Sequence, residues 1–531
     1  MLGLQFHRVR CLHLAFIAFC AAGPDALAET VYRIGNVGEP GSLDPGQIST
    51  SYENRIVGDM FMGLVTEAAD GRVVPGAAES WVIDDDGRTY TFTLRRHNWS
   101  DGTPVTGEDF VFALRRIVDP GSAAPYAFQL YPIRNAERLN SGALQDMAAL
   151  GVSAPDPQTL RITLERPTPY FLGELTSFAT YPVPEHVVER LGNGWAKPGE
   201  IVGNGAFIVK EWVPQTQVVS EKNPNFYDAE NVAIDKVIYY SDENQEALLK
   251  RFRAGEIDYA ANFPSTEIGW LREHLPSSVR INTELGINYY AVNTRRAPLG
   301  DVRVRRALSM AVDREAITGR MLKTGEVPAY SFVPPGTSNY GEPTNAAWRD
   351  MSYEQRLATA RQLMEDAGYG PDHRLRLTIK YNTSETYKMV AVAVQNMWRR
   401  LGVDAALENS EVKVHYNLLE QGDFDIGRAG WIADYDDAQS FLLMFQSRAG
   451  TQNYGRYSNP DYDRIMESAA VTLDPRVRSD LLHRAEQMVL DDAAAIPIMY
   501  YVSKSLVQPY VQGWQPNVRN VHRARYISLA K

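Results

Sequence analysis

Residues 375–407 contain the pattern that most restricts how this chain can fold. Residues 375–381 have the character of a strand, residues 386–401 that of a helix ending at Gly402, and residues 403–407 that of a second strand. This is the order of a βαβ unit, in which a crossover helix joins two parallel strands. Strand-like and helix-like segments also alternate along the rest of the chain. The sequence therefore predicts a mixed α/β architecture.

Capping patterns locate further elements. Residues 106–116 open with Thr106, an N-cap candidate, and place acids in the first turn and bases in the last, which complements the helix dipole. Residues 352–368 open with Ser352 and end at Gly368, a typical C′ residue. Similar patterns predict helices at 301–312, 460–470 and 477–490, and strands at 90–94, 424–426 and 495–501.

Two loops are predicted to follow strand ends. Residues 382–386 follow the first strand of the βαβ unit, and residues 427–441, GRAGWIADYDDAQSF, follow a short strand. Open α/β sheets bind ligands outside the carboxyl ends of their strands, so both loops could line one crevice. The second loop places Arg428, Trp431 and Asp434 close together. It is either an acidic surface turn or a binding site for a positively charged group.

The first 28 residues are typical of a secretory signal peptide. Arg8 and Arg10 supply a positive region, and Cys11–Gly23 is an almost entirely apolar run. This run is shorter than the ~20 residues that a membrane-spanning helix needs. Ala26–Ala28 has the small-x-small pattern of a cleavage site. The mature chain is therefore predicted to begin at Glu29 and to be exported to the periplasm.

Two alternatives compete with the signal peptide. An amphipathic helix would need a polar face, which the apolar run lacks. A lipid-anchored protein would use Cys20, but a lipid-modified cysteine normally follows a small residue and Phe19 precedes it here. Because Cys11 and Cys20 are the only cysteines, the mature chain is predicted to have no disulfide, thiolate metal site or cysteine nucleophile. Its roughly 500 residues must rely on a buried core.

Composition and motifs argue against several functions. The net charge of −11 argues against nucleic-acid binding, which typically uses a basic surface. The sequence contains no HExxH, GxSxG, Walker or GxGxxG motif. Asp434, Asp436 and Asp437 lack the spacing of a calcium loop. We therefore predict no catalytic residue, no metal site and no cofactor, and keep an exported hydrolase that uses paired carboxylates as an alternative.

Several blocks stand in a recognisable order. The clearest are Trp99–Val111, Asn223–Tyr227 and Asp301–Leu308, and the segment Arg428–Tyr435 has the pattern R-A-G-W-x-A-D-Y. Together they resemble the bacterial extracellular solute-binding proteins of family 5, and within that family the members that bind oligopeptides for ABC transporters. The resemblance covers essentially the whole mature chain. The other blocks that carry it are Glu39–Pro45, Asp59–Leu64, Pro75–Trp81 and Ile496–Tyr500.

The resemblance implies a fold of the type II-like periplasmic binding class, with two main lobes, a hinge and an extra inserted domain. Closure of the hinge, near residues 284–288 and 500–503, would bury the ligand. The expected boundaries are a signal peptide at 1–28, lobe I at 29–61, 186–286 and 502–531, inserted lobe II at 62–185, and lobe III at 287–501.

The resemblance also implies how a peptide is held. Asp434 would pair with the free α-amino group of the ligand, through a charge-assisted contact. The backbone of Gly430 and of Ile432 would pair with the main chain of the peptide. Such pairing does not depend on the side chains of the peptide. Arg428 would either dock the carboxylate end of a short peptide or brace Asp434. The other candidate ligand-binding residues are Trp431, Tyr435, Tyr126, Ser51, Asn382 and Tyr387. Asp436 and Asp437 are expected to be a solvated pair that starts a helix.

Four positions depart from the family pattern and leave the preferred peptide length open. Tyr387 replaces a histidine, Leu419 an arginine, Val412 a tryptophan and Ser49 a glutamate. The expected function is that of a monomeric exported protein which captures oligopeptides in the cleft between its lobes and delivers these small peptides to the permease subunits of an ABC transporter. The alternatives are the same fold with another amine-bearing ligand, such as a dipeptide or a cell-wall peptide, or with another solute, and a chaperone-like or chemoreceptor-docking role.

Overall fold

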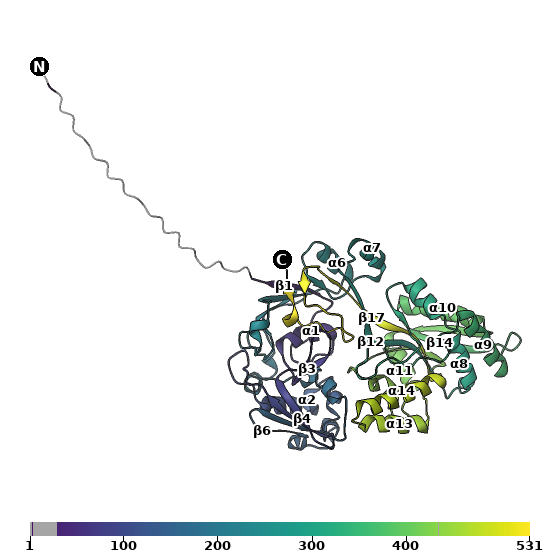
Figure 1. Cartoon of the computed structure of the whole chain (residues 1–531), viewed down its shortest axis with the longest axis horizontal. Helices are drawn as coiled ribbons and strands as arrows, with labels where there is room; N and C mark the ends of the chain where they lie inside the picture. Colours follow the sequence, from purple (N-terminus) through teal and green to yellow (C-terminus); the bar gives the residue numbers. More distant parts are fainter. Residues whose placement is uncertain (1–2, 4–28, 434, 531) are drawn as a thin grey trace.

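The computed structural model describes Gly3, residues 29–433 and residues 435–530. The predicted signal peptide, apart from Gly3, and Asp434 lie outside the described residues. The described chain forms two halves that lie side by side and are joined through β12 (Val279–Val292) and β17 (Ala495–Val507) (Figure 1). The first half holds the N-terminal elements together with the C-terminal end. The second half holds the elements from α8 to α14.

Across the described residues, a mixed sheet of eleven strands runs through both halves. Its order is β15-β14-β16-β12-β17-β11-β1-β10-β9-β8, with β13 pairing beside β17. Strands β14 and β15 pair in parallel along their whole length, which confirms the predicted βαβ unit. The bounds are β1 (Val31–Asn36), β8 (Phe207–Val213), β9 (Gln217–Lys222), β10 (Lys236–Ser241), β11 (Tyr259–Ala260), β13 (Val327–Pro328), β14 (Leu375–Asn382), β15 (Val403–Ser410) and β16 (Ile426–Ile432).

A bulge interrupts the long antiparallel pairing of β12 with β17. The register shifts between Thr283 and Ile287. Bulges bend a strand and change the direction of a side chain. This bulge lies where the two strands pass from one half of the molecule to the other (Figure 1). Gly286 fits within it because a Cβ there would lie 2.7 Å from the ring of Tyr501.

Helices cover both faces of the sheet in the second half. Tyr289 and Tyr290 are neighbours on β12, so they point to opposite faces and pack in different cores. The core of Tyr290 includes side chains from α8, α9 and α10, and that of Tyr289 includes side chains from α11 to α14. The bounds are α8 (Val302–Met310), α9 (Tyr353–Asp366), α10 (Glu385–Arg399), α11 (Val412–Gln421), α12 (Gln439–Leu442), α13 (Pro460–Val471) and α14 (Pro475–Asp491).

The first half contains a smaller antiparallel sheet of four described strands, in the order β4-β5-β7-β6. Phe110 and Leu114 of α2 pack in the same core as Phe92 of β5. Asp109 accepts a hydrogen bond from Thr106 N at 2.8 Å, as expected for a capped helix start. The remaining bounds are β2 (Val65–Glu67), β3 (Val73–Pro75), β4 (Ala78–Ile83), β5 (Thr89–Leu94), β6 (Val152–Asp156), β7 (Thr159–Thr163), β18 (Val511–Gln512), β19 (Ser528–Leu529), α1 (Ser51–Met60), α2 (Gly107–Val118), α3 (Ala136–Asn140), α4 (Phe171–Glu174), α5 (Glu185–Leu191), α6 (Gln245–Arg253) and α7 (Ile268–His274).

The C-terminal tail packs on α1 in the first half. Arg523 donates to the carbonyl oxygen of Asn54 at 2.6 Å and to its Oδ1 at 3.2 Å. The guanidinium group lies so close to α1 that a Cβ at Gly58 would overlap it. The C-terminal tail and the N-terminal elements therefore belong to the same structural unit in the first half.

Two predictions about residues 427–441 are wrong. The short strand does not end at residue 426, because β16 begins at Ile426 and extends to Ile432. Asp436 and Asp437 are not a solvated pair. Asp437 is 2% exposed and accepts two hydrogen bonds from Arg478, both at 2.7 Å. Asp436 accepts from Ser338 N at 2.8 Å, and burial raises its pKa.

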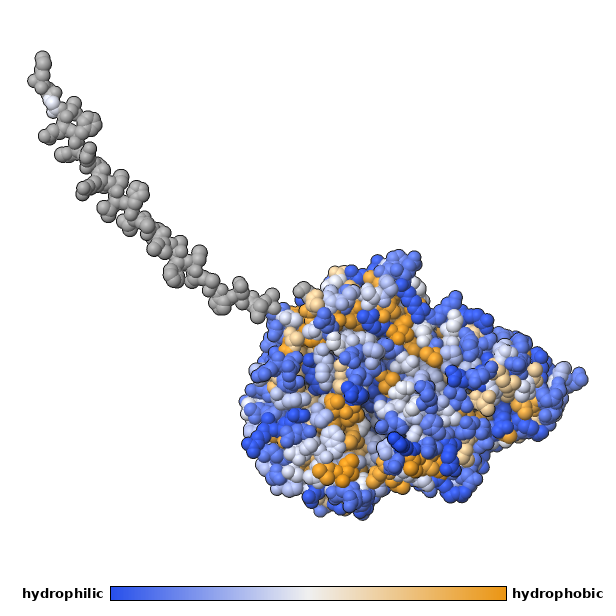
Figure 2. Space-filling model, in the orientation of Figure 1, coloured by the Kyte–Doolittle hydropathy of each residue, from blue (hydrophilic) through white to orange (hydrophobic). Residues whose placement is uncertain are grey.

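The surface is hydrophilic over most of the face in Figure 2, with hydrophobic residues gathered along parts of the boundary between the halves. None of the helices in the described residues has the length and apolar character needed to cross a membrane. Within the same residues, no group of three or more His, Cys, Asp or Glu side chains is placed to hold a metal ion.

Candidate ligand-binding site

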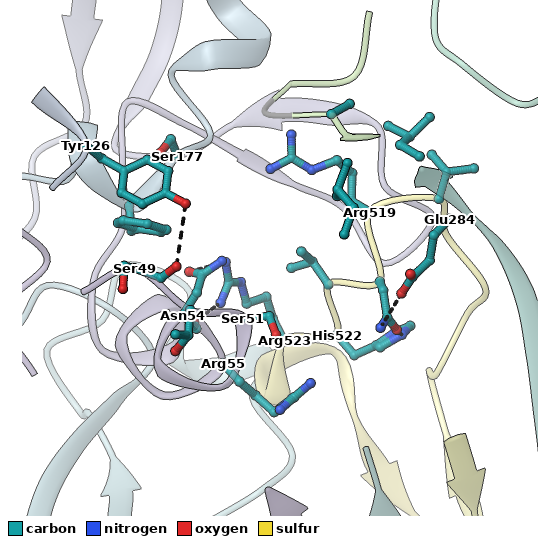
Figure 3. Close-up of a pocket in the computed structure, with 18 of the residues that line it drawn as sticks. Ser49, Ser51, Asn54, Arg55, Tyr126, Ser177, Glu284, Arg519, His522 and Arg523 are labelled. Carbon is teal, nitrogen blue, oxygen red and sulfur yellow. Dashed lines mark hydrogen bonds between the residues drawn. The ribbon is translucent and has the colours of Figure 1, made fainter. Parts of the chain in front are cut away.

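A cavity of about 490 Å³ lies between the two halves. Figure 3 places Ser49 and Tyr126 on one side of it and Glu284 and Arg519 on the other. The described residues that line it come from six segments of the chain. They are Ser49, Thr50, Ser51, Asn54 and Arg55; Tyr126 and Gln129; Ser177 and Phe178; Glu284, Leu285, Ile432 and Ala433 of the β12–β16 pair; and residues 518–523.

The end of β16 presents an open edge beside this cavity. β16 pairs with β12 as far as Ile432, but it pairs with β14 only at its first two residues. Ala433 N–H donates to the carbonyl oxygen of Leu285, on β12, at 2.9 Å. Because alternate residues in an antiparallel strand direct their polar groups to the same side, those of Trp431 also face β12. The N–H and C=O groups of Gly430 and Ile432 therefore face the other edge, where none of the described strands pairs with them.

Glycine is required at two positions of β16 because other side chains occupy the space of a Cβ. At Gly430 a Cβ would overlap the hydroxyl of Tyr501 and would lie 3.0 Å from a guanidinium nitrogen of Arg428. At Gly427 it would overlap the side chain of Leu419. Leu419 itself is fully buried in the core, so the leucine that replaces the family arginine faces away from solvent.

Arg428 is a buried cation held by uncharged groups. It is 4% exposed and donates to Asn382 Oδ1 and Tyr416 Oη, each at 3.2 Å, and to the hydroxyl of Tyr501. Its guanidinium carbon lies 3.5 Å from the ring centroid of Tyr387. None of the described carboxylates forms an ion pair with it, and no described group accepts from its Nε. Such a charge is stabilised by an anion, which a ligand can supply.

His415 hydrogen-bonds to the main chain of β16 just before the open edge begins. Its Nε2 donates to the carbonyl oxygen of Arg428 at 2.7 Å. The His415 ring is fully buried, and burial lowers its pKa, which favours the neutral form. The main-chain acceptor of Arg428, beyond the residues that pair with β14, is thereby satisfied within the protein, and the open groups begin at Gly430.

Tyr126 and Ser51 line the cavity, as the sequence predicts for ligand-binding residues. Tyr126 Oη donates to the carbonyl oxygen of Ser49 at 3.5 Å, and its ring meets that of Phe178 edge to face, with centroids 5.1 Å apart. Ser51 is the first residue of α1, directly after the N-cap Thr50. The N-terminus of α1 thus borders the cavity.

Trp431 and Tyr435 do not line the cavity. Trp431 is half-buried against the core of the second half, and its Nε1 donates to Ser440 Oγ at 3.4 Å. Tyr435 is 7% exposed, and its ring stacks on that of Tyr170 in the first half. Both side chains are thus held by contacts within the protein rather than directed into the cavity. Ile432, in contrast, is exposed in the cavity wall.

Charged side chains surround the cavity unevenly. The described residues lining it include Arg55, Arg519 and Arg523 but a single carboxylate, that of Glu284. Arg519 and Arg523 lie 3.5 and 3.8 Å from the carboxylate of Glu67, outside the lining. Two of the three guanidinium groups therefore have a counter-charge within the protein.

His522 lies among these arginines as a neutral ring. It stacks on Trp514, with ring centroids 4.4 Å apart. Burial, and then the charges of Arg55 and Arg523, lower the pKa of His522 to about 3. At neutral pH the ring adds no charge to the cavity wall.

Six of the sequence-predicted residues thus fall into two neighbouring groups. Ser51, Tyr126 and Ile432 line the cavity, whereas Asn382, Tyr387 and Arg428 form a cluster behind Gly430. Glu284 and residues 518–523 were not among the ligand-binding residues predicted from the sequence. No local pattern marks them, because they reach the cavity only through long-range packing of the tail and the bulge in β12.

Comparison with known proteins defines the class of the protein. The sequence profile of the bacterial extracellular solute-binding proteins, family 5 Middle, matches residues 72–453. The chain is 38% identical over 484 residues to the periplasmic murein peptide-binding protein MppA of Escherichia coli (strain K12), covering 90% of this chain and 89% of that protein. Its identity to the periplasmic oligopeptide-binding protein OppA of Salmonella typhimurium is also 38% over 484 residues, covering 90% of this chain and 88% of that protein.

The same relationship holds in three dimensions. The unliganded open form of the murein tripeptide-binding protein MppA matches with a TM-score of 0.88 at 36% identity, covering 94% of this chain and 98% of that one. The chain belongs to the bacterial extracellular solute-binding proteins of family 5. It is a periplasmic, non-enzymatic substrate-binding protein of an ABC transporter, with the three-domain α/β fold of its relatives.

Proposed function

We propose that this protein captures short peptides by their free α-amino end and by their main chain. The observation that carries the proposal is the open edge of β16. Gly430 and Ile432 direct main-chain donors and acceptors away from β12, beside the cavity. An extended peptide can add to such an edge as a further strand, and the pairing is indifferent to its side chains.

Asp434 is the proposed acceptor for the α-amino group of the peptide. It lies outside the described residues, but its neighbours are held on both sides. Ala433 donates to β12, and Tyr435 stacks on Tyr170. A carboxylate between two anchored residues is well suited to a charge-assisted contact with an ammonium group. Loss of one partner from a buried charged pair costs ~3–5 kcal/mol.

Arg428 is the proposed partner for the carboxylate end of a short ligand. The cluster of Asn382, Tyr387 and Tyr501 holds the guanidinium group without neutralising it. The buried charge then gains most from a ligand that carries an anion. Bracing of Asp434 by Arg428 is the alternative role for the same side chain.

The proposal extends to the lobes and their movement. Lobe I comprises 29–61, 186–286 and 502–531, the inserted lobe II 62–185, and lobe III 287–501. The bulge in β12 lies at the boundary between lobes I and III and provides the hinge. Closure of the lobes on a peptide would give the monomeric protein the shape that the permease subunits accept.

A cell-wall peptide is the second candidate ligand. The protein is 38% identical both to a protein named for murein peptides and to one named for oligopeptides. Both kinds of peptide can present an α-amino group and a carboxylate, so the main-chain edge and Arg428 serve either ligand.

Calorimetric titration of the ligand-free mature protein tests the proposal. The ligands are mixed tri- to pentapeptides and their N-acetylated copies. Free peptides are expected to bind, and acetylation is expected to weaken binding at least 100-fold, because ~3–5 kcal/mol of ion-pair energy is lost. Asp434→Asn is expected to remove the difference between the two forms.

Asp436→Asn is the matched control, since this nearby acid pairs with Ser338. It is expected to keep the preference for free peptides. Equal binding of free and acetylated peptides by the unmodified protein would remove Asp434 from the proposed role. Binding of neither form would refute peptide capture.

A further inference from the structure

Glu284 is the one carboxylate among the described residues that line the cavity. It lies in the bulge of β12, between Thr283 and Ile287, where the register with β17 shifts. In a regular strand, side chains alternate between the two faces of the sheet, so the direction of this side chain would follow from that alternation. A bulge interrupts the alternation and can turn the side chain in another direction. In Figure 3 its carboxylate lies on the wall that faces Ser49 and Tyr126.

Glu284 has no cationic partner among the described residues. Its Oε1 accepts a hydrogen bond from Asn520 Nδ2 at 3.0 Å, and no described Lys, Arg or His forms an ion pair with it. Lys504 acts on Glu284 and lowers its pKa, but its ammonium group lies 3.1 Å from Glu326 and 3.0 Å from Ser265 Oγ. Burial raises the pKa of Glu284, as expected for a carboxylate that has lost water without gaining a counter-charge.

The position of Glu284 in the site limits what can reach it. The next residue, Leu285, accepts the hydrogen bond from Ala433 N–H. Glu284 therefore lies beside the end of β16 that leads into Asp434. In the proposed binding mode, the amino end of the peptide lies at this point, so the side chains that approach Glu284 are those of the first two ligand residues.

The arginines that line the cavity do not supply a counter-charge to Glu284. Arg519 and Arg523 lie within 4 Å of Glu67, and Arg55 donates to Asn36 Oδ1 at 2.5 Å. None of them makes an ion pair with Glu284. A mostly buried carboxylate with one amide partner gains most from a cation that enters with the ligand.

We infer that Glu284 and Asn520 form a subsite for a positively charged side chain, a primary ammonium or a guanidinium group, on the first or second residue of the bound peptide. This inference rests on the proposed function, because it takes the position of the peptide from the open edge of β16. It adds a preference for basic residues that main-chain pairing does not supply.

Matched peptides test the subsite by calorimetry. Lys-Ala-Ala and Ala-Lys-Ala are compared with norleucine-Ala-Ala and Ala-norleucine-Ala, which keep the aliphatic chain and lack the charge. The protein is expected to bind at least one lysine peptide about tenfold more tightly than its norleucine copy, as for a charge pair with restricted access to water. Equal affinity within both pairs would overturn the inference without any variant.

Two variants test whether the preference for a lysine side chain depends on the carboxylate of Glu284. Glu284→Gln keeps the shape of the side chain and is expected to reduce the ratio of lysine to norleucine affinity to about one. Glu408→Gln, which alters an acid paired with Lys380 away from the cavity, is the matched control and is expected to keep the ratio. A ratio that survives in Glu284→Gln would also overturn the inference. If the unmodified protein binds none of the four peptides, it is the proposed function that fails.

Discussion

Tyr170 and Tyr435 stack with their ring centroids 4.6 Å apart and their planes 6° from parallel. The contact joins the residue before α4, in the first half, to the residue after Asp434, in the second. Gln439 Nε2 also donates to Tyr170 Oη at 3.3 Å. The first half of the molecule thus contributes directly to the placement of the proposed amine-docking segment.

Removal of this stack should weaken peptide binding. Tyr170→Ala is expected to lower affinity for free tripeptides about tenfold, because aromatic pairs contribute ~0.5–1.5 kcal/mol beyond their area. Tyr170→Phe keeps the stack and loses only the hydrogen bond from Gln439, so its affinity should stay within about threefold of the original. Titration calorimetry measures both. Equal losses in the two variants would show that the hydroxyl, not the ring, positions the segment.

The buried pair of Arg478 and Asp437 should stabilise the fold. Each of its two hydrogen bonds is 2.7 Å long, and both side chains are almost fully buried. Arg478→Met leaves the carboxylate without its partner and is expected to lower the free energy of unfolding by ~3–5 kcal/mol. Urea denaturation measures the change.

An exposed pair on the neighbouring helix provides the control. Arg464 and Asp461 on α13 have about 70% of their side chains exposed. Arg464→Met should change the free energy of unfolding by less than ~1 kcal/mol, because water screens surface pairs. A similar change in both variants would contradict the importance of burial.

Gly430→Ala should block the open edge while the protein remains folded. The added Cβ overlaps the Tyr501 hydroxyl, so either Tyr501 moves or β16 shifts toward the peptide. We expect tripeptide affinity to fall at least tenfold, since a shift of this size costs ~1–3 kcal/mol in a packed site. The double variant Gly430→Ala/Tyr501→Phe removes the overlapping oxygen and should recover part of the loss. No recovery would show that the overlap is not the cause.

His522 should make the protein sensitive to mild acid. Its pKa is about 3 in the folded state, against 6.5 for an ordinary histidine. As pH falls below 6.5, the unfolded chain takes up a proton that the folded protein refuses, so stability is lost from that pH down to about 3. The slope from this one group is at most ~1.4 kcal/mol per pH unit.

Urea denaturation at pH 7, 5.5 and 4.5 can isolate this contribution. His522→Gln should lose less stability on acidification than the unmodified protein. His274, whose side chain is 47% exposed, provides the control, and His274→Gln should follow the original pH dependence. The same acid sensitivity in His522→Gln as in the original protein would refute this role of His522.

Local patterns predicted the regular elements well. The helix at 386–401 and its flanking strands correspond to α10, β14 and β15, because capping residues and apolar periodicity lie within each segment. The extent of β16 could not be predicted in the same way. Two glycines argue against a strand in sequence terms, whereas in the structure they make room for Leu419 and Tyr501.

The candidate site was predictable only in part. The family motif identified Arg428 and Gly430, but local sequence gave no sign that Arg428 is caged by Tyr387 and Tyr501. Asp437 looked solvated because its partner, Arg478, is 41 positions away. Contacts of this kind depend on which surfaces meet after folding, and a single sequence does not show that.

The tail that packs on α1 sets the order in which this protein can be completed. Arg523 meets Asn54 across 469 positions, and β11 takes its place between β1 and β17 only when β17 has been made. Closure of so long a loop is entropically costly and slow. The packing around α1 and β1 therefore becomes complete only when the last part of the chain has been made. A nascent polypeptide of this design keeps part of its fold incomplete until its synthesis ends, which suits a protein that works on the far side of a membrane.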